Sequence, residues 1–244
     1  MVSPSPDDMN RFHFTQDQIL GLDDSALLEV DGHRLLPEVA DALEQLCAAA
    51  ARCGFELRIA SGYRSYARQL MIWDNKLTGK RPVLDADDQV IDLETLSIAQ
   101  RLEAVLRFSA LPGTSRHHWG TDLDVFDAAA VDSDYCVQLN NEEVSEGGCF
   151  TRFHDWLDER IASGESFGFY RPYDRDRAGV APERWHLSYA PLARECQNRL
   201  DAEALVSLWR RGSEFEPVER AAVERQLEAI FERYVHRVAA VPNP

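Results

Sequence analysis

Apolar residues recur at helical spacing in several segments of the chain. Between residues 36 and 52 they fall on one face of a helix, and Pro37 suits a first helical position. Helices are also predicted from about Tyr66 to Leu77, within residues 96–108, and around residues 150–161. From Pro191 onward, two further apolar stripes predict helices as far as about residue 238.

Short strands are predicted between these helices. Phe55, Leu57 and Ile59 alternate with polar residues, which is typical of a half-buried strand. The runs DLDVFD (122–127), GFY (168–170) and WHLSY (185–189) indicate three more. Because helices and strands do not alternate regularly, the pattern favours an α+β fold, with a small antiparallel sheet flanked by helices, over a doubly wound parallel sheet.

These patterns divide the chain into three parts. Residues 1–11 are rich in Pro, Ser and Asp, and we expect them to be loose. Residues 12–190 are expected to form the main domain. Residues 191–244 are expected to form a helical extension packed on its core, with dimerisation as the alternative role, so the choice between monomer and dimer stays open.

The net charge of −16 limits the partners of the protein. It argues against nucleic acid, whose binding needs clustered Lys and Arg, and against an anionic membrane surface. The N-terminal residues lack the basic and apolar runs of a secretory signal, and no apolar segment approaches the ~20 residues that span a bilayer. The expected location is the cytoplasm, or the periplasm if a leader is missing from the chain.

The cysteines carry little functional signal. Their number is odd and no CxxC motif occurs, which argues against a disulfide framework and a thiolate zinc site. Cys47 and Cys53 are expected to be buried as small hydrophobic residues. Cys136 and Cys149 bracket a polar, acidic loop, and whether they pair stays open.

The chemistry is concentrated in SRHHWGTDLD (115–124) and in ERWH (183–186). His117 is followed by Asp124, and Glu183 precedes His186 by three residues. Imidazole and carboxylate suit zinc, and a catalytic zinc keeps three protein ligands and one open position. The metal lowers the pKa of a bound water toward ~7, and a nearby carboxylate that is not a ligand can then take the proton.

The same residues resemble the motifs of a known family. SRHHWGTDLD resembles the S-x-H-x-x-G-x-A-x-D signature, and ERWH the E-x-W-H signature, of the VanY-type zinc D-alanyl-D-alanine carboxypeptidases and D-Ala-D-Ala dipeptidases. The fold of that family is shared with the Hedgehog signalling domain. SGYRSYARQ (61–69) is similar to a third block of the family, and the three blocks span residues 61–189 in family order.

The resemblance implies a role for each matched residue. His117, Asp124 and His186 would bind zinc, and Glu183 would act as general base and then as general acid.

The remaining matched residues face the substrate or support the site. Arg64 would hold the substrate carboxylate, for which its planar pair of donors is suited, or polarise the scissile carbonyl. Ser115 would contact substrate, and Trp185 would pack beneath the site.

The implied activity is that of a metallocarboxypeptidase or dipeptidase of cell-wall metabolism. It would remove D-alanine from peptidoglycan-type peptides with a free C-terminal carboxylate, or cleave D-Ala-D-Ala. The sequence leaves open D,D or L,D specificity and the choice between a dipeptide and a muropeptide.

Two residues compete for roles in the site. Asp122 stands where the family has a small residue, and on a strand it shares a face with Asp124. It is a candidate ligand, a partner for a histidine N–H, or an acceptor for a substrate amine. His118 is the rival of His117, and the register of the motif favours His117.

Two other functions fit parts of the pattern. Two histidines and a carboxylate also form the facial triad of non-haem iron oxygenases, although the seven-residue gap between His117 and Asp124 favours hydrolysis. A domain of this fold can also hold zinc as a non-catalytic binding module, which the presence of Glu183 and Arg64 disfavours.

Overall fold

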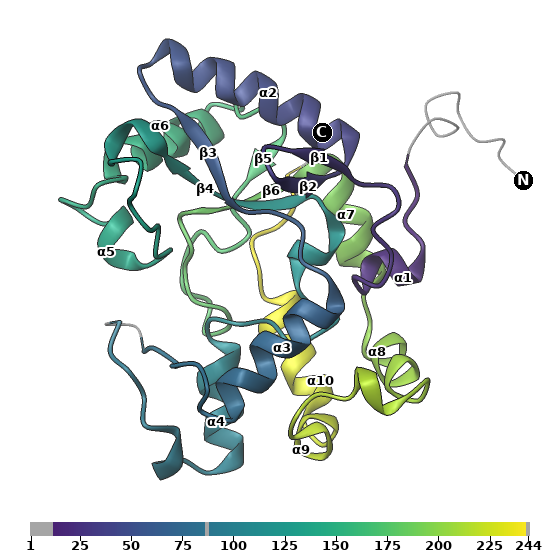
Figure 1. Ribbon diagram of the computed structural model, residues 1–244. Helices are drawn as coiled ribbons and strands as arrows, with labels where there is room; N and C mark the ends of the chain where they lie inside the picture. The colour runs from purple at the N-terminus through teal and green to yellow at the C-terminus, as the bar shows by residue number, and fades with distance from the viewer. Residues whose placement is uncertain (1–11, 86–87, 243–244) are drawn as a thin grey trace, which may run out of the picture.

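A four-stranded antiparallel sheet forms the centre of the molecule (Figure 1). The computed structural model describes residues 12–85 and 88–242, so the segment 1–11, predicted to be loose, lies outside the described residues. The strand order is β3-β4-β6-β5. The bounds are β3 (Leu57–Ser61), β4 (Asp122–Asp127), β5 (Phe169–Tyr170) and β6 (His186–Tyr189). The predicted α+β fold with a small antiparallel sheet is confirmed.

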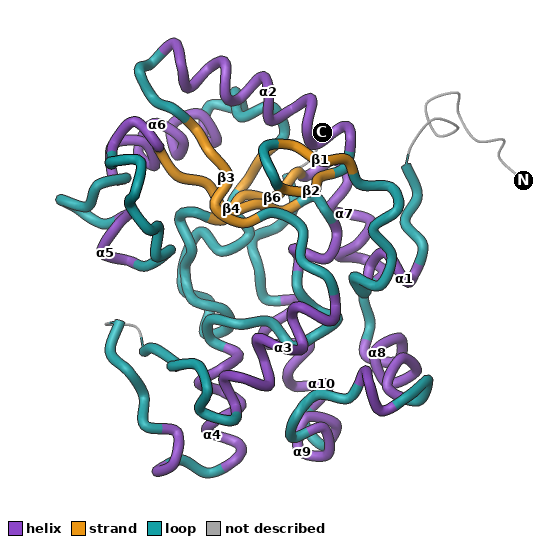
Figure 2. Tube along the Cα trace, viewed as in Figure 1, coloured by secondary structure: helices purple, strands orange, loops and turns teal. Residues whose placement is uncertain are grey.

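The longer helices lie around this sheet. In the view of Figure 2, α2 (Pro37–Arg52) and α6 (Thr151–Ala162) lie above the orange strands, and α3 (Tyr66–Leu77) and α4 (Ile98–Leu106) lie below them. The apolar stripe of α2 is buried, as its periodicity predicts. Side-chain oxygens begin the two lower helices, because Ser65 and Ser97 accept hydrogen bonds from the third backbone N–H of α3 and α4.

The region before α2 contains a hairpin that the sequence analysis did not predict. β1 (Leu28–Val30) pairs with β2 (His33–Leu35) across a two-residue turn. Asp31 and Gly32 in this turn both have positive φ. An Asp-Gly pair is a strong signal for such a turn, so the hairpin was visible in the sequence.

Short helical elements complete the first part of the chain. They are α1 (Gln16–Ile19), η2 (Leu93–Thr95), η3 (Arg116–Trp119), η4 (Ala128–Ala130) and α5 (Asn141–Val144). Of these, η3 matters most for function, because it leads directly into β4.

The residues after β6 are helical. They form α7 (Ala190–Arg199), α8 (Ala202–Trp209), η5 (Ser213–Phe215), α9 (Arg220–Glu224), α10 (Leu227–Ile230) and the π-helical turn η6 (Phe231–His236). Their buried apolar side chains belong to the same hydrophobic core as those of α2 and α3. Trp209 also donates from its indole nitrogen to the Tyr66 hydroxyl at 3.1 Å, which ties α8 to α3.

Three expectations about individual residues need correction or completion. Cys53 is exposed because it lies at the C-cap of α2, beyond its buried face, and Cys47 is only partly buried against the core. Cys136 and Cys149 are exposed and unpaired. The acidic loop is mostly solvated, but Glu143 is buried, and its carboxylate accepts from the backbone N–H groups of residues 138 and 139.

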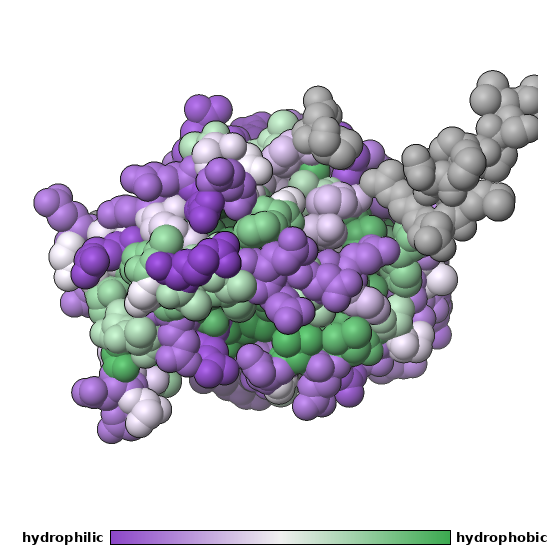
Figure 3. All heavy atoms as spheres, turned by 90° about the horizontal axis from the view of Figure 1, so that it is seen from above, coloured by the Kyte–Doolittle hydropathy of each residue, from purple (hydrophilic) through white to green (hydrophobic). Residues whose placement is uncertain are grey.

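The surface is predominantly polar. On the face seen in Figure 3, hydrophilic side chains surround smaller apolar areas. Within the described residues, every helix is too short or too polar to cross a membrane.

Candidate metal centre

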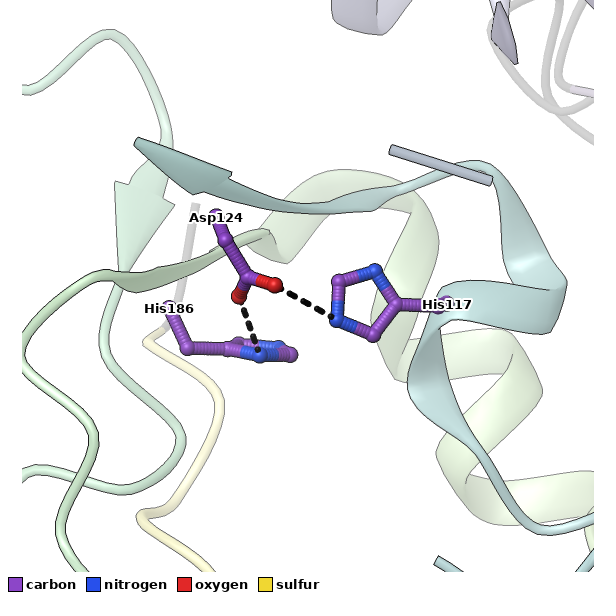
Figure 4. Close-up of side chains that lie close together, drawn as sticks. All are labelled: His117, Asp124 and His186. Carbon is purple, nitrogen blue, oxygen red and sulfur yellow. Dashed lines mark ion pairs between the residues drawn. The ribbon is translucent and has the colours of Figure 1, made fainter. Parts of the chain in front are cut away.

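Three elements bring His117, Asp124 and His186 together. His117 lies in η3, Asp124 in β4 and His186 at the start of β6. Nε2 of His117 is 3.4 Å from Oδ2 of Asp124, and Nδ1 of His186 is 3.2 Å from Oδ1 of Asp124 (Figure 4). One nitrogen or oxygen from each residue lies within 4.8 Å of the others, and all three residues are buried. The three predicted ligands therefore converge on one point.

Backbone geometry explains this convergence. Asp124 and His186 are directly opposed in the antiparallel pairing of β4 and β6, although 62 positions separate them along the chain. Gly120 ends η3 with φ of 67° and turns the chain into β4, which brings His117 back over Asp124. A side chain at Gly120 would be strained in this conformation, and its Cβ would lie 2.5 Å from Cδ2 of Leu27.

The outer nitrogens of both imidazoles are held by acceptors. Nδ1 of His117 lies 2.9 Å from the carbonyl of Gly62, and Nε2 of His186 lies 2.9 Å from Oδ1 of Asp122. A carbonyl and a carboxylate only accept, so these nitrogens carry the protons. The inner nitrogens, which face Asp124, are therefore the ones that would offer lone pairs to a bound metal ion.

The donor set fits a metal ion. Oδ1 of Asp124 is buried, and within residues 12–85 and 88–242 it accepts no hydrogen bond of acceptable geometry. Burial disfavours protonation of His186, but Asp122 and Asp124 outweigh it and raise the pKa of His186 to about 9. A cation on the inner nitrogen of His186 would take the place of this proton, and two nitrogens with one carboxylate suit a divalent ion.

Asp122 holds His186 and lies outside the group of ligands. Its side chain is fully buried and accepts from Nε of Arg116 at 2.7 Å and from the hydroxyls of Thr121 and Ser188 at 2.6 and 3.1 Å. Burial raises its pKa, but the charge of Arg116 and these donors prevail and lower the pKa to about 2. Of the three roles that its position allowed, Asp122 therefore has that of partner to a histidine N–H.

Arg116 supports the candidate site, and the sequence analysis did not single it out. It is buried, and its Nη2 donates to the Tyr170 hydroxyl at 2.9 Å and to Ser188 Oγ at 2.7 Å. Its Nη1 donates to Gln197 of α7, and its guanidinium lies 4.6 Å from the centre of the Trp119 ring. Arg116 thus connects the C-terminal helices to Asp122, and the only signal in the sequence was its place inside the motif.

His118 has a structural role. Its Nδ1 donates to the carbonyl of Arg64 at 2.6 Å, and its Nε2 accepts from the backbone N–H of Gly113 at 3.1 Å. Burial lowers its pKa to about 3, so the ring is neutral. With both nitrogens occupied, His118 fixes the backbone of Arg64.

Glu183 and Arg64 lie beside the ligand group. Oε2 of Glu183 is 3.5 Å from Nδ1 of His186, and burial raises the pKa of Glu183 to about 7. The guanidinium of Arg64 donates to Gln69 at 2.9 Å and to Ser61 at 3.3 Å. Among the described residues no carboxylate oxygen lies within 4.0 Å of Arg64, so its remaining donors are available to a ligand.

A cleft of about 420 Å³ opens over the ligand group. Ser115 lines it and is buried, and Trp185 lines it while packing against Phe150 and Val144. The acidic loop rims the cleft with residues 138–141. The arrangement places the three candidate metal ligands, the Glu183 carboxylate and the Arg64 guanidinium on one accessible cavity.

The chain is similar to several known proteins. The family model VanY, described as D-alanyl-D-alanine carboxypeptidase, matches residues 32–192. A protein of Haemophilus influenzae is 31% identical over 127 residues, which are 51% of this chain and 92% of that protein. A D-alanyl-D-alanine carboxypeptidase of Enterococcus faecalis is 28% identical over 165 residues, 66% of this chain and 50% of that enzyme. The chain thus spans only half of the Enterococcus enzyme.

Two solved structures are also similar. One is a mutant of the vancomycin resistance D,D-pentapeptidase VanY in complex with Zn(II), at 27% identity and a TM-score of 0.47 over 67% of this chain and 77% of that one. The other is VanYB in complex with D-alanine-D-alanine, at 24% identity and a TM-score of 0.48 over 74% of this chain and 87% of that one.

Proposed function

This chain belongs to the VanY family of D-alanyl-D-alanine carboxypeptidases, and on that basis we propose that it is a zinc-dependent peptidase. Its substrates are peptidoglycan-type peptides that end in D-alanine, or D-Ala-D-Ala itself. The observation that carries this proposal is the convergence of His117, Asp124 and His186, with Glu183 beside them.

The three converging residues hold the zinc ion in this proposal. A zinc ion supplies Lewis acidity, which polarises a carbonyl oxygen and makes water easier to deprotonate. Asp122 and the Gly62 carbonyl keep the two imidazoles in the tautomers that ligation needs.

Glu183 moves the proton. Its carboxylate takes a proton from the attacking water as the water oxygen bonds to the scissile carbonyl carbon. It then gives this proton to the amide nitrogen as the C–N bond breaks, which releases a shortened peptide and D-alanine. The burial of Glu183 and its raised pKa suit a group that must both accept and donate near neutral pH.

Arg64 positions the substrate. Its free donors match a carboxylate in two-pronged geometry, so it binds the terminal carboxylate or steadies the developing negative charge on the carbonyl oxygen. Ser115 lines the same cleft and offers a hydroxyl to the peptide.

Release of D-alanine tests the proposal. The purified protein is assayed with D-Ala-D-Ala and with tetrapeptide and pentapeptide stems, with and without chelator, and its metal is identified by mass spectrometry. We expect one zinc per chain and chelator-sensitive release of D-alanine. Glu183→Gln should retain zinc and lose about 10²–10⁴-fold in kcat, whereas Glu142→Gln, an exposed control in the acidic loop, should match the wild type.

Other results would contradict it. Zinc without turnover of any of these peptides would indicate a non-catalytic binding module. Iron in the site together with oxygen consumption would indicate an oxygenase. Equal turnover by Glu183→Gln would remove this residue from the mechanism.

A further inference from the structure

A lysine without an acidic partner faces the cleft. Lys76 lies in the last turn of α3 and lines the cleft together with Arg64 and Arg81. Its Nζ donates to the hydroxyl of Ser109 at 2.6 Å. Within the described ranges 12–85 and 88–242, no carboxylate oxygen lies within 4.0 Å of the Lys76 ammonium. The C-terminal end of a helix stabilises a cation through the helix dipole, but this effect also acts on an exposed side chain. It therefore does not explain why Lys76 is half-buried in the cleft.

Three cationic side chains share one cleft, although the net charge of the chain is −16. About half of the cationic side chains that the structure describes end on carboxylates, as Arg107 does on Asp176 and Arg184 does on Asp158. Within the part of the chain that the structure describes, Lys76, Arg64 and Arg81 make no such pair. Asp88, Asp124 and Glu183 also line the cleft, but none of them forms an ion pair with these three cations.

The positive charge of these cations is costly without a bound anion. Burial and the charges of Arg81 and Arg64 lower the pKa of Lys76, Glu183 opposes them, and the pKa is about 8 as a result. An anion that enters the cleft relieves both the repulsion and part of the desolvation. One terminal carboxylate neutralises one of the three charges and leaves two.

We propose that Lys76 and Arg81 form an anion subsite beside Arg64 that takes a second carboxylate of the peptide substrate. The inference rests on the proposed function, in which Arg64 binds the terminal carboxylate. It deepens that function by naming the substrate class, which is a peptide with an acidic side chain close to the released D-alanine. Such a preference weakens with salt, because the subsite is open to solvent on one side.

Peptide pairs that differ by one charge test the subsite. Peptides ending in D-Ala-D-Ala are prepared with glutamate or glutamine at each of the two preceding positions, which changes charge at constant shape. At low ionic strength we expect the wild type to favour glutamate in kcat/KM by about 10-fold at one of these positions, equivalent to about 1.4 kcal/mol.

Single substitutions test whether Lys76 and Arg81 cause the preference for glutamate. Lys76→Met and Arg81→Gln should each reduce the ratio of glutamate to glutamine peptide to below about 3-fold, by removing one of the two charges. Lys80→Met removes the charge of an exposed neighbour that does not line the cleft, and it should keep the full ratio. Arg81 is itself exposed, so its variant should fold even if that of Lys76 does not.

Binding provides a measurement that needs no turnover. The dissociation constants of the same peptides for Glu183→Gln should show the same preference for glutamate, and Lys76→Met in that background should remove it. Equal cleavage and binding of both peptides at both positions, or a preference that survives Lys76→Met with Arg81→Gln, would overturn the subsite.

The same data separate this inference from the proposed function. Zinc-dependent cleavage without a preference for glutamate leaves the function intact and overturns the subsite. Preferential binding of the glutamate peptide without any cleavage supports the subsite and refutes the function.

Discussion

The buried pair of Arg116 and Asp122 provides a quantitative prediction for stability. Their side chains are 4% and 0% exposed, and their atoms meet at 2.7 Å. The substitution Arg116→Met keeps apolar volume near Trp119 but leaves the Asp122 carboxylate buried without its cationic partner. Breaking a buried ion pair in this way costs about 3–5 kcal/mol, a large part of the ~5–15 kcal/mol by which a domain is stable.

Removing both charges should lower the free energy of unfolding by less than the sum of the two single substitutions. Asp122→Ala leaves Arg116 without its carboxylate, whereas the double variant leaves neither charge unpaired. We expect the double variant to be more stable than additivity predicts by at least about 2 kcal/mol.

Urea unfolding followed by tryptophan fluorescence measures these free energies. Chelator is present throughout, so that differences in metal binding do not contribute. The control is Arg211→Met, which removes a pair with Asp17 in which both side chains are about half exposed. This control should lower the free energy of unfolding by less than about 1 kcal/mol. A loss in Arg116→Met no larger than in the control, or strict additivity in the double variant, would refute the reasoning.

Three further predictions concern the metal, pH and the turn before β4. Asp122→Ala should weaken zinc binding by about 10–100-fold, because His186 loses the acceptor that orients its ring, and competition with a chromophoric chelator measures this; unchanged affinity would exclude that role. His154 is buried, and burial followed by the charge of Arg171 places its pKa well below the usual value, so only the unfolded chain takes up this proton below about pH 6.5. As the pH decreases below about 6.5, this group should therefore lower the free energy of unfolding by about 1.4 kcal/mol per pH unit. Between pH 6 and 5 the urea midpoint of His154→Asn should depend less on pH than that of the wild type; an equal pH dependence of the two midpoints would argue against this role. Gly120→Ala should lower stability by about 1–3 kcal/mol in thermal melts, since φ is 67° and the new Cβ meets Leu27, and an unchanged melting temperature would be inconsistent with that strain.

Local sequence determined much of the fold. The helix predicted from Tyr66 to Leu77 has these bounds in the structure, because Ser65 caps its start and its apolar stripe is buried. The strand predicted from Phe55 begins only at Leu57, because Phe55 instead packs against aromatic side chains of α6. Such tertiary contacts set the ends of elements and are not visible in periodicity.

The candidate site was recognisable through its motifs, but its supporting contacts were not. His117, Asp124 and His186 stood out because their residue types and order match a family. That Asp124 opposes His186 depends on the register of two strands, which chain spacing does not reveal. The contacts of Arg116 with Tyr170 and Gln197 join residues 54 and 81 positions away, so local reasoning could not find them.

Anomalous diffraction at the zinc edge, from crystals grown with zinc, tests the metal centre most directly. We expect a single strong peak at about 2.0–2.3 Å from Nε2 of His117, Nδ1 of His186 and a carboxylate oxygen of Asp124. A peak bound through His118 or Asp122 instead, or no peak among the three residues, would contradict the assignment of the metal site and the hydrolytic function that depends on it.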